Sequence, residues 1–139
     1  MVQNHGTGMI SQGGREWRDY VVEAGIVPHL VTSAGIAARV QGLKRYYALL
    51  VYADGKVRLV KELDGTQVLA EKDFVFTWDD NIHLKLEVKG IHLKAWVNDS
   101  EAFNLEDTKS PLLEGGVALV VEEGRISCDK VMVFPARVQ

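Results

Sequence analysis

Three observations in the sequence predict an all-β domain built as a sandwich of two antiparallel sheets. Runs rich in Val, Ile, Leu, Tyr and Phe alternate with polar residues at a period of two, as half-buried strands do. The 13 glycines interrupt these runs at short intervals. No stretch of a dozen residues carries an apolar stripe at helical spacing. Short strands at such spacing are typical of sandwiches and jelly rolls.

Ten strands are expected, each an apolar or alternating run of short length. They cover residues 7–12, 17–27, 34–41, 46–53, 56–62, 66–71, 82–88, 91–98, 116–122 and 125–134. A chain of 139 residues suits one hydrophobic core. Residues 1–139 are therefore interpreted as a single β-sandwich domain.

The composition argues against several classes of partner. The net charge is -3 and the pI is about 5.8, so neither nucleic acid nor an anionic membrane surface is an expected partner. No apolar run reaches the roughly 18 residues of a membrane span. The N-terminal "MVQNHGTGMISQGG" lacks the pattern of a signal peptide, and a cytoplasmic location is expected. The one cysteine, Cys128, cannot form an internal disulfide and is interpreted as a small core residue.

One hairpin is expected around "LEVKGIHLKAW", with its turn at Lys89-Gly90. The pairs on its first face are Val88 with Ile91, Leu86 with Leu93, Leu84 with Ala95 and Ile82 with Val97. All are apolar, so this face is assigned to the core. The other face carries lysines, His83, His92 and Trp96, and is expected to be solvated.

A second hairpin is expected to turn at Asp54-Gly55. The expected pairs are Tyr52 with Val57, Leu50 with Leu59, Ala48 with Lys61 and Tyr46 with Leu63. A four-residue loop at 42–45 then places Arg39 opposite Ala48, and Gln41 opposite Tyr46. One face of this three-stranded sheet therefore combines two cations with an amide and an aromatic ring.

Burying Arg39 and Lys61 without partners would cost several kcal/mol, so both are expected to face water, an acid or a ligand. Two interpretations stay open. The face is either a solvated surface whose cations pair with Glu62, Glu71 or Asp73, or it is a groove that binds a ligand.

Four segments carry a resemblance to a known family: "NHGTGMISQGGREWRDYVVEA", "AGIAARVQGLKRYYALL", "LEVKGIHLKAWVND" and "GGVALVVEEGRISCDKVMVFP". The chain resembles the concanavalin A-like β-sandwich modules of bacterial carbohydrate-active proteins. It is similar in particular to the module at the C-terminal end of bacterial ADP-ribosylglycohydrolase-family proteins. The resemblance implies a jelly-roll fold of two curved antiparallel sheets and a glycan-binding role for the concave sheet.

Glycans are bound by aromatic faces and by planar polar groups. The candidate ligand-binding residues are Arg39, Gln41, Tyr46, Lys61, Trp78 and His5. Arg39 would donate a fork of hydrogen bonds and Tyr46 would stack on a sugar ring. On this interpretation Arg39→Ala abolishes glycan binding and changes stability by less than about 1 kcal/mol.

No cofactor is expected apart from the structural calcium ion that many similar modules hold. Asp129 is its candidate ligand, because it matches an aspartate often seen in the last strand of such modules. The histidines have no Cys or carboxylate set at zinc-binding spacing.

The sequence contains no complete set of catalytic carboxylates for glycoside hydrolysis. Glu71-Lys72-Asp73 begins the Glu-x-Asp-x-Glu pattern of laminarinase-like enzymes, but Val75 and Phe76 stand where the third carboxylate would be. Non-catalytic glycan binding is therefore the expected function. The alternative is a protein-interaction or oligomerisation module, whose sheet edge or Trp96 face docks a catalytic domain of a larger protein or a second copy. A glycoside hydrolase-like enzyme is the third choice.

Overall fold

The structure is a computed structural model of the chain. The residues that it describes are 2–12, 18–29, 32–42, 45–63, 65–77, 80–109 and 111–135. The side chains of 2–12, 42, 123–130 and 134–135 lie outside the description. The described residues form strands and connections, and none of them belongs to a helix that could span a membrane.

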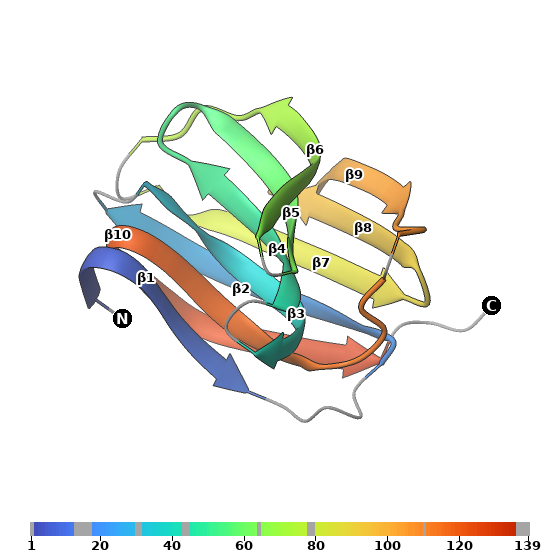
Figure 1. Cartoon of the computed structure of the whole chain (residues 1–139). Helices are drawn as coiled ribbons and strands as arrows, with labels where there is room; N and C mark the ends of the chain where they lie inside the picture. The colour runs from blue at the N-terminus through green and yellow to red at the C-terminus, as the bar shows by residue number, and fades with distance from the viewer. Residues whose placement is uncertain are drawn as a thin grey trace.

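Ten strands occur among the described residues, and every pairing between them is antiparallel. They are β1 (Val2–Gln12), β2 (Tyr20–His29), β3 (Ser33–Gly42), β4 (Arg45–Tyr52), β5 (Lys56–Leu63), β6 (Thr66–Asp73), β7 (Ile82–Lys89), β8 (His92–Val97), β9 (Ser100–Glu106) and β10 (Gly116–Pro135). The strand order is β6-β5-β4-β3-β10-β2-β7-β8-β9, with β1 paired to β10 (Figure 1).

The long strand β10 belongs to both layers of the sandwich. Its residues 116–122 pair with β3, and its residues 125–135 pair with β2. One layer therefore contains β6, β5, β4, β3 and the first part of β10, and the other contains the second part of β10 with β2, β7, β8 and β9. The all-β sandwich of two antiparallel sheets predicted from the sequence is confirmed.

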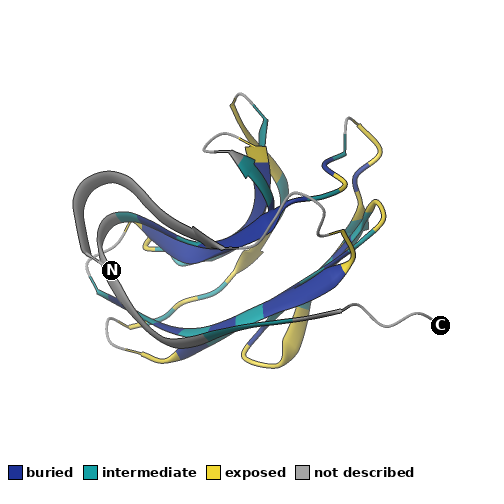
Figure 2. Ribbon diagram, turned by 90° about the horizontal axis from the view of Figure 1, so that it is seen from below, coloured by how far each residue is buried: buried dark blue, intermediate teal, exposed yellow. Residues whose placement is uncertain are grey.

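The main core lies between the two layers, where buried segments of both face each other (Figure 2). β7 alternates buried and half-buried residues over its whole length, as predicted for this hairpin. Leu86 is fully buried. Ile36, Tyr47 and Leu49 belong to the same core cluster from the opposite layer. The assignment of the apolar face of this hairpin to the core is therefore correct.

The partners within the β7–β8 hairpin differ from the prediction by two residues. Val88 pairs with Leu93 and Leu86 with Ala95. The turn includes Gly90, which has a φ of 58°, and Ile91, which is exposed. A shift by two leaves the paired side chains on their predicted faces, because side chains alternate with a period of two, but Ile91, predicted on the core face, lies exposed in the turn.

The predicted register of the β4–β5 hairpin is wrong by one residue. Tyr52 pairs with Lys56, because the turn contains three residues, 53–55, rather than two. A one-residue change moves a whole strand to the opposite face. Lys61 therefore pairs with Tyr47 on the core side and does not lie beside Tyr46.

A β-bulge in β3 overturns the predicted position of Arg39. Ala37 pairs with Ala48 and Gly42 pairs with Arg45, with an irregular stretch between Ala38 and Gly42. Arg39 has a φ of 53°, a left-handed conformation that is uncommon outside glycine. The bulge re-aims its side chain, as bulges commonly do.

Two further strands differ from the prediction. β9 was not expected, and its run "SEAFNLE" shows no regular alternation, with Phe103 as its one buried residue. The expected strands 116–122 and 125–134 are one continuous strand, since Gly124 continues the pairing rather than ending it.

Candidate functional site

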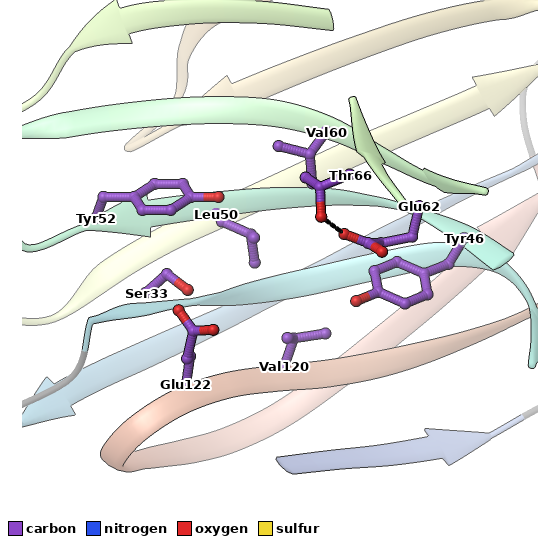
Figure 3. Close-up of a pocket in the computed structure, with 9 residues that line it drawn as sticks. All are labelled: Ser33, Tyr46, Leu50, Tyr52, Val60, Glu62, Thr66, Val120 and Glu122. Carbon is purple, nitrogen blue, oxygen red and sulfur yellow. Dashed lines mark hydrogen bonds between the residues drawn. The ribbon is translucent and has the colours of Figure 1, made fainter. Parts of the chain in front are cut away.

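A hollow opens on the outer face of the layer that contains β3 to β6, away from the main core. Its lining residues come from five strands and are Ser33, Tyr46, Leu50, Tyr52, Val60, Glu62, Thr66, Val120 and Glu122 (Figure 3). Its volume is about 190 Å³, below the roughly 300–1,000 Å³ of pockets that enclose drug-sized ligands. It therefore suits a small group, such as one ring of a longer ligand.

The strand β4 shows why the two faces of this layer differ. Tyr47 and Leu49 belong to the main core, whereas Tyr46, Ala48 and Leu50 belong to a second, smaller apolar cluster. This second cluster also contains residues of β3, β5 and β10: Ala37, Val60, Ala118 and Val120. Its members are buried although the described residues place no second layer over them, as expected on the concave side of a curved sheet (Figure 2).

Small residues form the centre of this concave face. Gly35 lies between Leu50 and Val120 in the pairing of β3 with its neighbours. A Cβ added at Gly35 would lie 1.9 Å from the carbonyl oxygen of Leu49, so only glycine fits there. The backbone of β4 therefore occupies the space that a side chain at this position would need.

Two tyrosines of β4 stand on this face. Tyr46 and Tyr52 are six residues apart, which separates their α-carbons by roughly 20 Å along a strand. Their hydroxyl groups point toward the middle of the hollow from opposite ends (Figure 3). Burial raises the pKa of Tyr46 to about 12, and the charges of Glu62 and Glu122 act in the same direction. The hydroxyl therefore stays protonated at neutral pH and can both donate and accept a hydrogen bond.

Two carboxylates line the hollow on different strands. Glu62 on β5 accepts a hydrogen bond from the hydroxyl of Thr66. Glu122 on β10 pairs with Ser33 of β3, and its carboxylate points toward the Ser33 side chain (Figure 3). The hollow thus offers hydroxyl and carboxylate groups around an apolar floor.

Arg58 sits at the Tyr52 end of the same face. Its guanidinium carbon lies 4.3 Å from the centroid of the Tyr52 ring, a cation–π arrangement. Its Nη2 lies 2.9 Å from Asp54 Oδ2 and 2.9 Å from Glu71 Oε1. Arg58 is therefore held by two carboxylates and covers one face of the Tyr52 ring.

Arg39 was expected to face water, an acid or a ligand, and the structure places it beside an acid, Asp19, rather than in water or in the hollow. Its side chain is buried between the layers, at 0% exposure. Its guanidinium donates hydrogen bonds to three backbone carbonyls: Arg18 at 2.9 and 3.0 Å, Leu112 at 2.8 Å, and Gly90. It also donates to Asp19 Oδ1 at 3.2 Å. Arg39 is a structural residue that joins three segments.

Lys61 is also buried away from the concave face on which it was predicted, and it faces an acid, Asp107, which was one of the expected alternatives. Its Nζ lies 2.7 Å from Asp107 Oδ2 and donates to the carbonyl of Lys109 at 2.5 Å. The hydroxyl of Tyr47 donates to the same Asp107 oxygen at 2.6 Å and accepts a hydrogen bond from the Leu112 N–H at 2.9 Å. Burial alone would raise the pKa of Asp107, but the hydrogen bonds from Lys61 and Tyr47 lower it below its ordinary value.

Gln41 likewise serves the connection between β9 and β10. Its amide nitrogen donates to the carbonyl of Glu114 at 2.9 Å. Three of the predicted ligand-binding residues therefore contact the connection between β9 and β10: Arg39 at Leu112, Lys61 at Asp107 and Lys109, and Gln41 at Glu114. Of the six predicted ligand-binding residues, Tyr46 is the one that the described part of the structure places in the hollow.

The remaining predicted site residues lie outside the description. These are Trp78, the side chain of His5, and the side chain of Asp129 proposed for calcium. The described residues contain no group of three or more His, Cys, Asp or Glu side chains arranged to hold a metal ion.

Sequence reasoning missed Tyr52, Glu62 and Glu122 as site residues. Tyr46 and Tyr52 are an even number of residues apart on β4, so the alternation of side chains alone places both on one face. Glu62 joins this face once the turn at 53–55 is given three residues. Nothing in the sequence alone places Glu122 beside β3.

Trp96 occupies the outer face of the other layer. The Nζ atoms of Lys85 and Lys94 lie 5.1 and 5.5 Å from its ring centroid. The two lysine side chains thus flank the half-buried ring and reduce the apolar area open to a partner. Docking through this face stays a prediction.

The fold is similar to that of several solved structures. The carbohydrate binding module CBM66 from Bacillus subtilis matches with a TM-score of 0.85 and 21% identity, over 94% of this chain and 83% of that chain. Caenorhabditis elegans galectin LEC-6 matches with a TM-score of 0.66 and 13% identity, over 96% and 94% of the two chains. A mutant of the GH43 protein BlXynB from Bacillus licheniformis matches with a TM-score of 0.67 and 12% identity, over 94% of this chain but 33% of that one.

No protein-family model and no curated protein matches the chain. The narrower resemblance to the module of ADP-ribosylglycohydrolase-family proteins stays a prediction. The structural matches agree with the strand arrangement described above, and the chain therefore has the concanavalin A-like β-sandwich fold.

Proposed function

We propose that the chain is a non-catalytic glycan-binding module whose ligand lies in the concave hollow. The observation that carries this proposal is the composition of the hollow: two tyrosines and two glutamates stand around an apolar floor of Leu50, Val60 and Val120. Sugars present both apolar C–H patches and hydroxyl groups, so a binding site needs these two kinds of surface side by side.

The chemistry of each group fits a sugar hydroxyl. Glu62 and Glu122 accept hydrogen bonds, and each carboxylate can accept from two neighbouring hydroxyls. The Tyr46 hydroxyl can donate one hydrogen bond to a sugar hydroxyl and accept another from it. Because Arg58 covers one face of Tyr52, that tyrosine is expected to contribute its hydroxyl and its other face.

The names of two matched structures agree with this proposal. The matched structures include one named a carbohydrate binding module and one named a galectin, and both align over nearly the whole of this chain. At such low sequence identity these matches concern the fold, and the function of this chain rests on the hollow itself.

The presence of two carboxylates in one hollow supports a second candidate, glycoside hydrolysis. Such enzymes use a pair of carboxyl groups on either side of the scissile bond. Glu62 and Glu122 lie on different strands at the hollow, and a GH43 protein is among the structural matches. The two candidates differ in one observable, which is whether a bound glycan is cleaved.

The test is a glycan array followed by calorimetry on each glycan that binds. The variants are Tyr52→Ala, Glu62→Gln and Glu122→Gln, and the matched control is Glu106→Gln on the far strand β9. We expect at least tenfold weaker binding in each hollow variant and unchanged binding in the control. Chromatography of each ligand after overnight incubation with the protein separates binding from hydrolysis.

Two results would count against the proposal. Unchanged affinity in all three hollow variants would place the ligand elsewhere. Cleavage of a bound glycan that is lost in Glu62→Gln or Glu122→Gln would establish the enzyme instead.

A further inference from the structure

We infer that the hollow selects its ligand by charge: it accepts neutral and amino sugars and rejects sugars that carry a carboxylate or a sulfate. This inference rests on the proposed glycan-binding function and names the ligand class for that same site. It concerns Glu62 and Glu122, the two charged residues that line the hollow.

Neither carboxylate is neutralised by a cation that the structure describes. Glu62 accepts a hydrogen bond from the uncharged Thr66, and Glu122 points toward the uncharged Ser33 (Figure 3). Among the described residues, no lysine or arginine forms an ion pair with either glutamate. A ligand in the hollow therefore meets two negative charges.

The cations of β5, the strand that carries Glu62, are already engaged by other carboxylates. Arg58 is held by Asp54 and Glu71. Lys56 Nζ lies 2.5 Å from Asp73 Oδ1. The third cation, Lys61, lies on the other face of the strand with Asp107. Lys56 and Lys61 therefore do not offset the negative charge of the hollow. The charge of Arg58 acts on Tyr52 in the opposite direction to the charges of the two glutamates, but Arg58 is itself paired with two carboxylates.

The field of both glutamates reaches the middle of the hollow. Glu62 and Glu122 both contribute to the raised pKa of Tyr46, whose hydroxyl points into it. The site is also concave and lined in part by apolar groups, and such walls concentrate the field of a single sign of charge. A third carboxylate brought in by a ligand would be repelled, whereas an ammonium group would be attracted.

The test uses an array of oligosaccharides whose terminal residues form matched sets: glucose, glucuronate and glucosamine, with the corresponding galactose and mannose sets. Within the sets that bind, we expect the uronate member to bind at least tenfold more weakly than the neutral member. The amino member should bind at least as tightly as the neutral one, and its advantage should shrink in high salt, because salt screens such attraction.

The double variant Glu62→Gln/Glu122→Gln separates charge from shape. It should narrow the difference between neutral and uronate sugars to less than about threefold, which is under 0.7 kcal/mol. The two single variants should give intermediate values, and Glu106→Gln should retain the full selectivity. Circular dichroism confirms that each variant is folded.

Each outcome has a defined meaning. Tight binding of a uronate or sulfated glycan by the parent chain would overturn the charge inference and leave glycan binding intact. Selectivity that persists in the double variant would also overturn it. Failure to bind any glycan would overturn the proposed function, and the inference with it.

Discussion

Replacing Arg39 by alanine should destabilise the fold strongly. The guanidinium donates to the carbonyls of Arg18, Leu112 and Gly90, and these belong to three separate segments of the chain. Alanine leaves the carbonyls without these donors. The sequence alone led to the opposite expectation, a change of less than about 1 kcal/mol, because it placed this side chain in an exposed ligand-binding site.

The expected magnitude follows from the surroundings of the guanidinium. A hydrogen bond to a charged group contributes about 1.5–3 kcal/mol, so three carbonyl partners give roughly 4–9 kcal/mol before any compensation. Burying the charge has a cost of several kcal/mol, which the alanine variant recovers. Arg18 and Gly90 are exposed residues, so water can partly replace the lost donor at their carbonyls. A net loss of about 2–4 kcal/mol is expected.

Urea unfolding followed by tryptophan fluorescence measures this loss. The matched control is Arg58→Ala, which removes an arginine whose ion pairs lie at the surface and which should cost about 1 kcal/mol or less. A loss below about 1 kcal/mol for Arg39→Ala, with glycan binding abolished, would refute the structural role and restore the role in ligand binding.

Three further predictions concern the core, a glycine and a buried ion pair. Leu86→Ala should cost about 2–5 kcal/mol in urea unfolding, since it truncates a fully buried side chain, and a cost under 1 kcal/mol would contradict its place in the core. Gly115→Ala should cost at least about 2 kcal/mol more than Gly65→Ala: both glycines have positive φ, but a Cβ meets backbone atoms at 2.4 Å only at Gly115. The pKa of Asp107 is lower in the folded state than its ordinary value of 3.8. The Asp107 carboxylate therefore stabilises the fold above pH 3.8, and this stabilisation is lost as the pH falls below that value. Unfolding free energies at pH 7, 5, 4 and 3 should therefore fall less steeply in Asp107→Asn, and equal slopes would show that Asp107 does not carry this pH dependence.

The sequence predicted the faces of β7 and β8 correctly because an error of two residues preserves them. The same reasoning failed in the β4–β5 hairpin, where the error was one residue. The Asp54-Gly55 pair is typical of a two-residue turn, but here a third residue, Ala53, is included. Alternation on β5 alone could not choose between the two turns, since its apolar residues include both Leu59 and Val60.

The position of Arg39 was beyond prediction for a different reason. Whether a bulge forms depends on the contacts that the extra residue makes. Here the extra residue is Arg39, and it contacts groups from three segments that are distant in the sequence. One of them is Gly115, whose missing side chain lets the two backbones approach closely. The hydroxyl of Tyr20 adds a further tie, since it accepts from the Arg39 N–H at 2.6 Å and donates to the Gly115 carbonyl at 2.8 Å. Contacts at such separations leave no local pattern in the sequence.

The strand β10 has a consequence for the order of events during folding. Its 20 residues close both layers, and it supplies Val120 and Glu122 to the hollow. These residues leave the ribosome after all the other strands, and their pairing with β1 joins segments far apart in the chain. A nascent chain therefore lacks part of the lining of the hollow until β10 is in place, and a probe that occupies the hollow would report that this strand has folded.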